Sequence, residues 1–162
     1  MKKQKKSQIM ANIEQEIYQK IPFSNEREKL IVNLMFTAHW LETQEREFLK
    51  KYSITLPQYN ILRILRGQSP NCISVVDIKK RMIDGSPDVS RLVERLRKQD
   101  YVSRFESEVD KRLVDVKITE KGLILLQEIQ KEREKNQPVF SHIDENELKN
   151  MNFYLDKLRT KP

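Results

Sequence analysis

The stretch that decides the fold is Ser86-Pro87-Asp88-Val89-Ser90-Arg91-Leu92-Val93-Glu94-Arg95-Leu96-Arg97-Lys98. Its apolar residues recur at the i, i+3, i+4 and i+7 spacing of one buried helix face. The opposite face is mostly polar, with three basic and two acidic residues, and consists of Pro87, Asp88, Ser90, Arg91, Glu94, Arg95 and Lys98. The stretch therefore predicts a short amphipathic helix that begins at Ser86-Pro87 and presents positive charge outward.

Two further helices are predicted before this one. Thr55-Leu56-Pro57-Gln58 is a strong helix start, because threonine and glutamine at this spacing form a capping box and proline is tolerated in a first turn. Apolar residues on one face carry that helix to Gly67. Ser74 and Asp77 repeat the capping pattern and predict a helix of about three turns that reaches Met82. Asp84-Gly85 then separates this helix from the basic one.

After the basic helix the apolar period changes from helical to alternating. Residues 102–106 and 113–118 are rich in β-branched and aromatic side chains, so they predict two strands of a hairpin. Asp110, Lys111 and Arg112 lie at its polar tip. Helix, short helix, tight turn, helix and hairpin, in that order, predict a winged helix-turn-helix DNA-binding domain over residues 53–121.

The segments before this domain predict a tail and two helices. Residues 1–8 are expected to form a disordered basic tail, and residues 9–52 to form N-terminal dimerisation helices. A stripe of isoleucines predicts a short helix that ends at Pro22, namely Ile9, Ile13, Ile17 and Ile21. Ser24 is expected to cap a long helix that reaches Lys51. The apolar arc over residues 30–41 is wider than the core of one monomer usually needs.

Residues 122–162 are predicted to form C-terminal dimerisation helices. Thr119 is expected to cap a helix that buries Leu123, Leu126 and Ile129 and fades by Asn136. Asp144, boxed by Glu147, predicts the start of a last helix. Its apolar residues follow the 3-4-3 spacing of a coiled-coil seam and are Leu148, Met151, Leu155 and Leu158. The predicted fold class is mainly α, with a small β-hairpin wing.

The amino-acid composition limits the classes of function that the chain can have. The chain has 162 residues and a formal net charge of +7 at pH 7, which favours polyanionic partners. It has only 3 glycines, and neither a phosphate loop nor a catalytic arrangement of Ser, His and Asp can be recognised, so no enzyme activity and no cofactor are expected. No apolar run is long enough to span a bilayer, which predicts a cytoplasmic protein with no membrane partner.

The single cysteine and the two histidines are weak signals. Because Cys72 is the single cysteine, the chain cannot form an intramolecular disulfide. Cys72 is either a small, inert hydrophobic residue or a reactive thiol, and the sequence leaves both interpretations open. His39 and His142 are isolated from each other and from any third ligand at a recognisable spacing. No metal site is therefore expected.

The predicted wing and basic helix carry side chains that suit DNA. Arg91 lies near the start of its helix, and its guanidinium fork fits either a guanine edge or a phosphate. Ser86 and Ser90 suit phosphate contacts. At the wing tip, Arg112 can enter the narrow minor groove of A·T-rich DNA, with Asp110 holding it by an ion pair.

Four separated motifs make the chain similar to the MarR family of bacterial transcription regulators over roughly residues 30–160. They are Leu56-Pro57-Gln58-Tyr59-Asn60-Ile61-Leu62, Ser90-Arg91-Leu92-Val93-Glu94-Arg95-Leu96, Asp110-Lys111-Arg112-Leu113 and Ile118-Thr119-Glu120-Lys121-Gly122. Two departures stand out. Asp100-Tyr101 replaces the family's usual pair of glycine and an apolar residue, and Asp88 puts an acid near the start of the basic helix.

The resemblance implies a homodimer that binds a pseudo-palindromic operator in double-stranded DNA, acts as a repressor and is released by a small-molecule effector. Phe36, His39, Trp40 and Tyr59 are placed to line an effector cleft. Aromatic residues at helical spacing also build dimer cores, so both interpretations stay open. The competing function is a winged-helix protein-interaction module with no operator, which binding insensitive to salt would reveal.

Overall fold

The computed structural model describes residues 12–85, 88–106, 114–136 and 139–160. The chain divides into two compact units, residues 1–56 and residues 57–162. Each unit is described by itself.

The first unit holds α1 (Ile13–Glu16) and α2 (Glu26–Lys50). Within the described residues, the prediction of a helix through Ile13, Ile17 and Ile21 is wrong. α1 is a single turn, because Tyr18 takes a φ of 54°, a left-handed conformation that a right-handed helix cannot continue through. Ile9 and the tail over residues 1–8 lie outside the described residues.

α2 begins one residue later than expected. Its N-cap is Asn25, not Ser24, and the Asn25 Oδ1 accepts hydrogen bonds from the Arg27 and Glu28 amides at 3.0 Å each. Asparagine is as good a cap as serine, which explains why Asn25 can take this role. Ser24 instead donates through its amide and hydroxyl to the Glu28 carboxylate, and this bonding lowers the pKa of Glu28.

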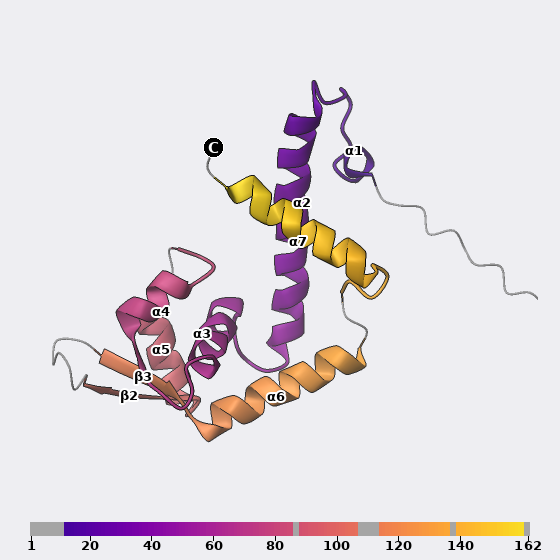
Figure 1. The fold of residues 1–162 in the computed structure, drawn as a ribbon. Helices are drawn as coiled ribbons and strands as arrows, with labels where there is room; N and C mark the ends of the chain where they lie inside the picture. Colours follow the sequence, from indigo (N-terminus) through magenta and orange to yellow (C-terminus); the bar gives the residue numbers. More distant parts are fainter. Residues whose placement is uncertain (1–11, 86–87, 107–113, 137–138, 161–162) are drawn as a thin grey trace, which may run out of the picture. The chain divides into compact units, whose positions relative to one another are not determined.

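The second unit contains a small sheet and most of the helices (Figure 1). α3 (Leu56–Arg66) is followed by β1 (Ile73–Ser74), α4 (Val75–Arg81) and α5 (Val89–Lys98). β2 (Val102–Glu106) and β3 (Val114–Ile118) form the hairpin, and α6 (Glu120–Lys135) and α7 (Glu145–Arg159) complete the unit. The hairpin strands match the prediction, apart from Leu113, which lies outside the described residues.

The sheet is antiparallel, with strand order β1-β3-β2. β2 pairs with β3 so that Val102 faces Ile118 and Arg104 faces Val116. β1 pairs Ile73 with Val116 on the other side of β3. The sequence missed β1, because two residues are too short to carry an alternating pattern.

α4 and α5 form the helix-turn-helix. α4 packs on α5 and on strands β1 and β3, while α5 packs on β2. Ser74 caps α4 as predicted, accepting from the Asp77 amide at 3.1 Å. α4 is shorter than expected, since it ends at Arg81 and Met82 is already extended. The Asn60 side chain of α3 accepts from the Ile83 amide at 3.1 Å, which ties the turn after α4 to α3.

The core of this unit draws on almost all its elements. The most deeply buried side chains of the unit are Ile61, Leu62, Leu65, Ile78, Val93, Leu96, Val116, Leu126 and Ile129. Thr119 caps α6 as predicted. Leu125 is buried and Leu123 is only half-buried, so the buried face of α6 is rotated slightly about the helix axis from the predicted one. The core confirms the predicted fold class, which is mainly α with a small β wing.

α7 differs from the other long helices of its unit. The predicted capping box is present, with the Glu147 amide bonded to the Asp144 side chain and the Asp144 amide bonded to the Glu147 carboxylate at 2.9 Å each. None of its side chains is buried. In the single chain, Met151, Leu155 and Leu158 of the predicted apolar seam are therefore exposed and Leu148 is half-buried.

Candidate nucleic-acid interface

The first turn of α5 is held by Asp88. Its Oδ1 accepts from the Arg91 amide at 3.1 Å, so Asp88 is the N-cap and the helix begins at Val89. The sequence had placed the start at Ser86-Pro87, which lie outside the described residues. An acid at this position is explained by capping and by the positive end of the helix dipole. The departure from the MarR pattern at Asp88 thus has a structural reason.

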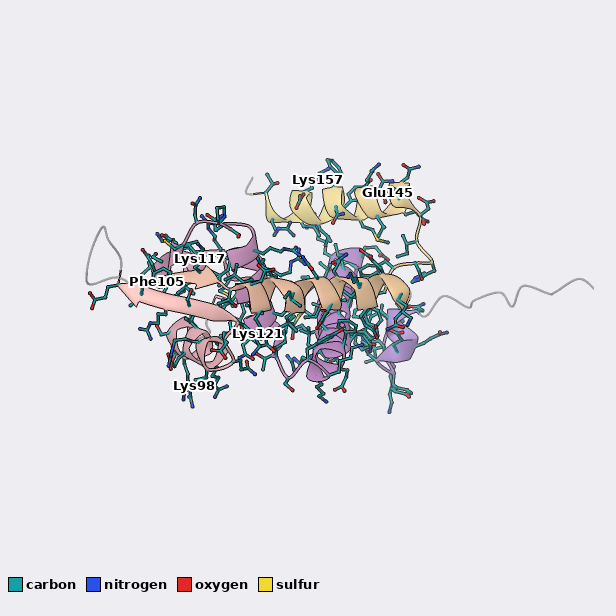
Figure 2. All side chains as sticks on the ribbon, turned by 90° about the horizontal axis from the view of Figure 1, so that it is seen from below. Lys98, Phe105, Lys117, Lys121, Glu145 and Lys157 are labelled. Atoms are coloured by element: carbon teal, nitrogen blue, oxygen red, sulfur yellow. The ribbon has the colours of Figure 1, made fainter. Side chains whose placement is uncertain are left out.

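The outward face of α5 is an exposed basic stripe. Arg91, Arg95 and Lys98 lie at i, i+4 and i+7 on one face of the helix, opposite the buried Val89, Val93 and Leu96. Figure 2 shows Lys98 pointing away from the sheet. Among the described residues, no salt bridge joins a carboxylate to any of the three, which leaves their charges available to an anionic partner. Ser90 is exposed as well.

Glu94 does not lie on the open outward face where it was predicted. The side chain is half-buried, and its carboxylate accepts two hydrogen bonds from Arg97, at 3.0 Å from Nε and 2.8 Å from Nη2. A second ion pair reaches Arg104 of β2, with 3.7 Å between Nη1 and Oε2. The hydrogen bond from Arg97 holds the pKa of Glu94 below its usual range. Glu94, Arg97 and Arg104 are called the Glu94 cluster below.

The two arginines of the Glu94 cluster are not among the residues predicted from the sequence to bind DNA. Arg97 could have been found from its i, i+3 spacing to Glu94, which places the two side chains side by side on a helix. Arg104 could not, because only the strand register opposite Val116 turns it toward α5. The cluster links the basic helix to the first strand of the wing.

The base of the wing has the predicted inner face. Val116 and Ile118 are buried and Val114 is half-buried, in the alternation expected of a strand packed on one side. Figure 2 labels Phe105 near the far end of β2, where its ring is partly exposed. Asp110, Lys111 and Arg112 lie outside the described residues, so their role at the tip remains a prediction.

The link between α5 and β2 is tied to the start of α6. Asp100 has a φ of 61°, and its carbonyl oxygen accepts from the Thr119 hydroxyl at 2.7 Å. The Tyr101 amide donates to the Leu96 carbonyl at 3.0 Å, and its carbonyl accepts from the Thr119 amide at 3.1 Å. The basic helix, the wing and α6 are therefore joined at one point.

The residues proposed to line an effector cleft fall in both units. Phe36, His39 and Trp40 lie on α2, where Phe36 is half-buried and the other two are exposed. Tyr59 is buried on α3, and the Arg63 and Arg133 guanidinium carbons lie 5.9 and 5.4 Å from its ring centroid. The exposed Trp40 and His39 suit a dimer contact as well as a ligand.

Other signals add little to the site. Cys72 is exposed, and its thiol lies 3.8 Å from an Asp115 carboxylate oxygen. Within the described ranges, His, Cys, Asp and Glu do not gather in threes that could hold a metal ion. Among the helices built from those ranges, none has the length and apolarity needed to cross a membrane.

A helix-turn-helix with a basic second helix, followed by a hairpin, defines the winged-helix class of transcription regulators. Residues 45–129 match the family model described as transcriptional regulator SarA/Rot, and the chain belongs to that family. It is therefore a transcriptional regulator and not an enzyme.

Curated relatives and solved structures agree with this assignment. The regulator MgrA of Staphylococcus aureus is 33% identical over 112 residues, which cover 67% of this chain and 72% of MgrA. A MarR variant from Escherichia coli, solved in complex with operator DNA, is 25% identical with a TM-score of 0.65, covering 80% of this chain and 96% of its own. The transcriptional regulator PA4135 has a TM-score of 0.68 at 25% identity, over 82% and 98% of the two chains. The MarR resemblance is confirmed.

Proposed function

We propose that this regulator binds a pseudo-palindromic operator as a homodimer, inserts α5 of each copy into the major groove and represses transcription. The observation that carries the proposal is the basic stripe on α5, where Arg91, Arg95 and Lys98 are exposed and free of salt bridges within the described residues. Solvated charges of this kind bind phosphates at little cost, because no intramolecular partner has to be broken.

The contacts divide by chemistry. Arg91 lies in the first turn of α5, where recognition helices of this class reach base edges, and its fork suits the O6 and N7 of guanine. Ser90, Arg95 and Lys98 suit phosphates on either side, as does the hydroxyl of Ser86, whereas Pro87 has no hydrogen-bond donor and is proposed to meet the DNA by van der Waals contact alone. Asp110, Lys111 and Arg112 are proposed to bring the wing tip to the minor groove.

Exposed apolar surface supports the homodimer. α7 leaves Met151 50%, Leu155 38% and Leu158 53% exposed along one stripe. α2 exposes a second set, which comprises Leu30, Ile31, Leu34 and Met35. Contiguous apolar residues of this size on a charged protein are typical of a partner surface. A second copy would also supply the second α5 that a two-fold symmetric operator requires.

The proposals of an effector site and of a cellular location rest on the sequence. A small molecule that binds beside Phe36, His39, Trp40 and Tyr59 would release DNA by changing the spacing of the two recognition helices. A protein that acts on bacterial DNA is placed in the cytoplasm, where that DNA lies.

The test is to select bound duplexes from a random pool and to measure affinity across about 50 to 200 mM salt. A symmetric consensus, bound far more tightly than random DNA and with steep salt dependence, is expected. Binding to every duplex with equal affinity would contradict the proposal that the protein recognises a specific operator. The absence of DNA binding altogether would leave the protein-interaction module as the function.

A further inference from the structure

α5 and the wing carry basic residues of two kinds. Arg91, Arg95 and Lys98 face outward with no salt bridge in the described part of the chain. Arg97 and Arg104 are both held by one carboxylate, that of Glu94. The difference is not exposure, since Arg97 and Arg104 keep 49% and 37% of their side-chain surface exposed. It lies in whether Glu94 can reach them.

We propose that Glu94 is a specificity-determining residue, which keeps Arg97 and Arg104 from adding sequence-independent phosphate contacts. The proposal rests on the DNA-binding function above. Arg97 precedes Lys98 in the last turn of α5. Once released, its long side chain is proposed to reach the phosphate backbone beside the one that Lys98 is proposed to contact. Each additional arginine on a phosphate raises affinity for any DNA sequence alike.

The geometry of the cluster suits this role. Arg97 is bound through both Nε and Nη2, the bidentate arrangement that orients a guanidinium most firmly. That bonding lowers the pKa of Glu94 and raises the pKa of Arg97, so both groups stay charged at neutral pH. The carboxylate cancels the positive charge of Arg97 and Arg104 on the flank of α5, whereas the stripe of Arg91, Arg95 and Lys98 forms no salt bridge with it.

The ion pair between Arg104 and Glu94 favours binding to the operator over binding to random DNA. Arg104 belongs to β2, so its ion pair with Glu94 ties α5 to the wing. An operator complex needs α5 and the wing to reach neighbouring grooves in one fixed geometry. Binding to random DNA requires only positive charge on the protein. Loss of Glu94 therefore adds affinity for random DNA and removes a restraint that only the operator complex uses.

The test measures binding of the full-length chain to a random-sequence duplex and to the duplex selected above. Glu94→Gln keeps the size and hydrogen-bonding ability of the side chain and removes its charge. Affinity for the random duplex should rise roughly fivefold to tenfold at about 0.1 M salt, with the salt slope steeper by about one to two per protomer. Affinity for the selected duplex should not rise, so the ratio of the two falls.

Two arginines that are two residues apart provide the control. Arg95→Gln should reduce the salt slope on random DNA by about one per protomer, whereas Arg97→Gln should leave it unchanged, because Glu94 already holds that charge. Arg97→Gln added to Glu94→Gln should reverse about half of the gain in slope. Glu42→Gln changes the net charge equally and frees Arg46, its partner at 2.8 Å on α2, and should leave both affinities unchanged.

Three results would overturn the inference. They are an unchanged slope in Glu94→Gln, an equal loss of slope in Arg95→Gln and Arg97→Gln, and a gain in Glu42→Gln as large as that in Glu94→Gln. Thermal unfolding of each variant separates these outcomes from a folding defect. If the unmodified protein binds no DNA, the proposed function fails first, and that result is distinct from a protein that binds DNA with no effect of Glu94.

Discussion

The carbonyl oxygen of Tyr101 occupies the space that a Cβ on Gly122 would need. Ile118 Cγ1 closes the same space from another side, at 2.8 Å from that Cβ position. The close approach lets Thr119 cap α6 through the Gly122 amide at 3.1 Å while also bonding the Asp100 carbonyl. Gly122 therefore permits the contact that joins α5, the wing and α6.

Gly122→Ala should lower the free energy of unfolding by about 1–3 kcal/mol, because backbone and a buried isoleucine must move to admit one methyl group. Gly85→Ala is the matched control. A Cβ there meets nothing within 4 Å, and no glycine among the described residues has a positive φ. Its stability should be unchanged or rise by about 0.4–1 kcal/mol. Denaturant titration of both variants checks this, and equal stabilities would contradict the steric argument.

Asp100→Gly should stabilise the protein. The φ of 61° at Asp100 is left-handed, which glycine adopts freely and which costs other residues roughly 1 kcal/mol. The ion pair with Lys121, at 3.9 Å between exposed groups, contributes little. Asp100→Ala removes the same charge without freeing φ and should destabilise. We expect Asp100→Gly to melt at a higher temperature than the unmodified protein and Asp100→Ala at a lower one. A higher melting temperature in both variants would show that the lost charge, not the backbone conformation, is responsible.

The same position shows what the sequence could predict. Hydrophobic periods and caps located α3, α5, the hairpin and α7, because each signal lies within a few consecutive residues. The replacement of glycine by Asp100 was visible as a departure from a family pattern. Its cause, a left-handed residue held by Thr119, depends on a contact across 19 positions of sequence.

The misses have the same origin. Asp88 was placed on the DNA-facing side from its position in the sequence, and only the structure identifies it as the cap of α5; its contact with DNA stays a prediction. Glu94 was placed outward for the same reason, although Arg104 draws it toward the wing. Helical periodicity states which face a residue is on, but not which neighbour from another element meets it there.

Leu155→Asp together with Leu158→Asp should convert the dimer to monomer or aggregate. Both residues lie on the exposed apolar stripe of α7, and burying two carboxylates in a dimer contact costs more than the contact provides. Phe153→Asp is the control, since Phe153 is 61% exposed but lies on the opposite face of the helix. Light scattering should report twice 19.4 kDa for the unmodified chain and the control. A monomeric unmodified chain at micromolar concentration would refute the homodimer.

Arg112→Ala should weaken binding to the operator and to A·T-flanked DNA and reduce the salt slope by about one per wing. A narrow minor groove attracts arginine through its width, so the loss should depend on the flanking sequence. Asp110→Ala should have a milder effect, because the arginine remains but is no longer held. Dimer mass and melting temperature should not change. Normal binding with an unchanged slope would remove the wing tip from the DNA contact.

Arg91→Ala should cost roughly 1–3 kcal/mol at the operator, the range of a bidentate base contact, and less on random DNA. Arg91→Lys separates the two contacts that an arginine can make. Lysine keeps the charge that a phosphate needs but lacks the planar fork that reads guanine. The lysine variant should therefore retain affinity for random DNA and lose most of the preference for the operator. Because the Arg91 amide is already bonded to Asp88, neither variant should disturb the start of α5. Equal losses on both duplexes in Arg91→Ala, with full operator affinity in Arg91→Lys, would make Arg91 a phosphate contact and move base recognition to another residue.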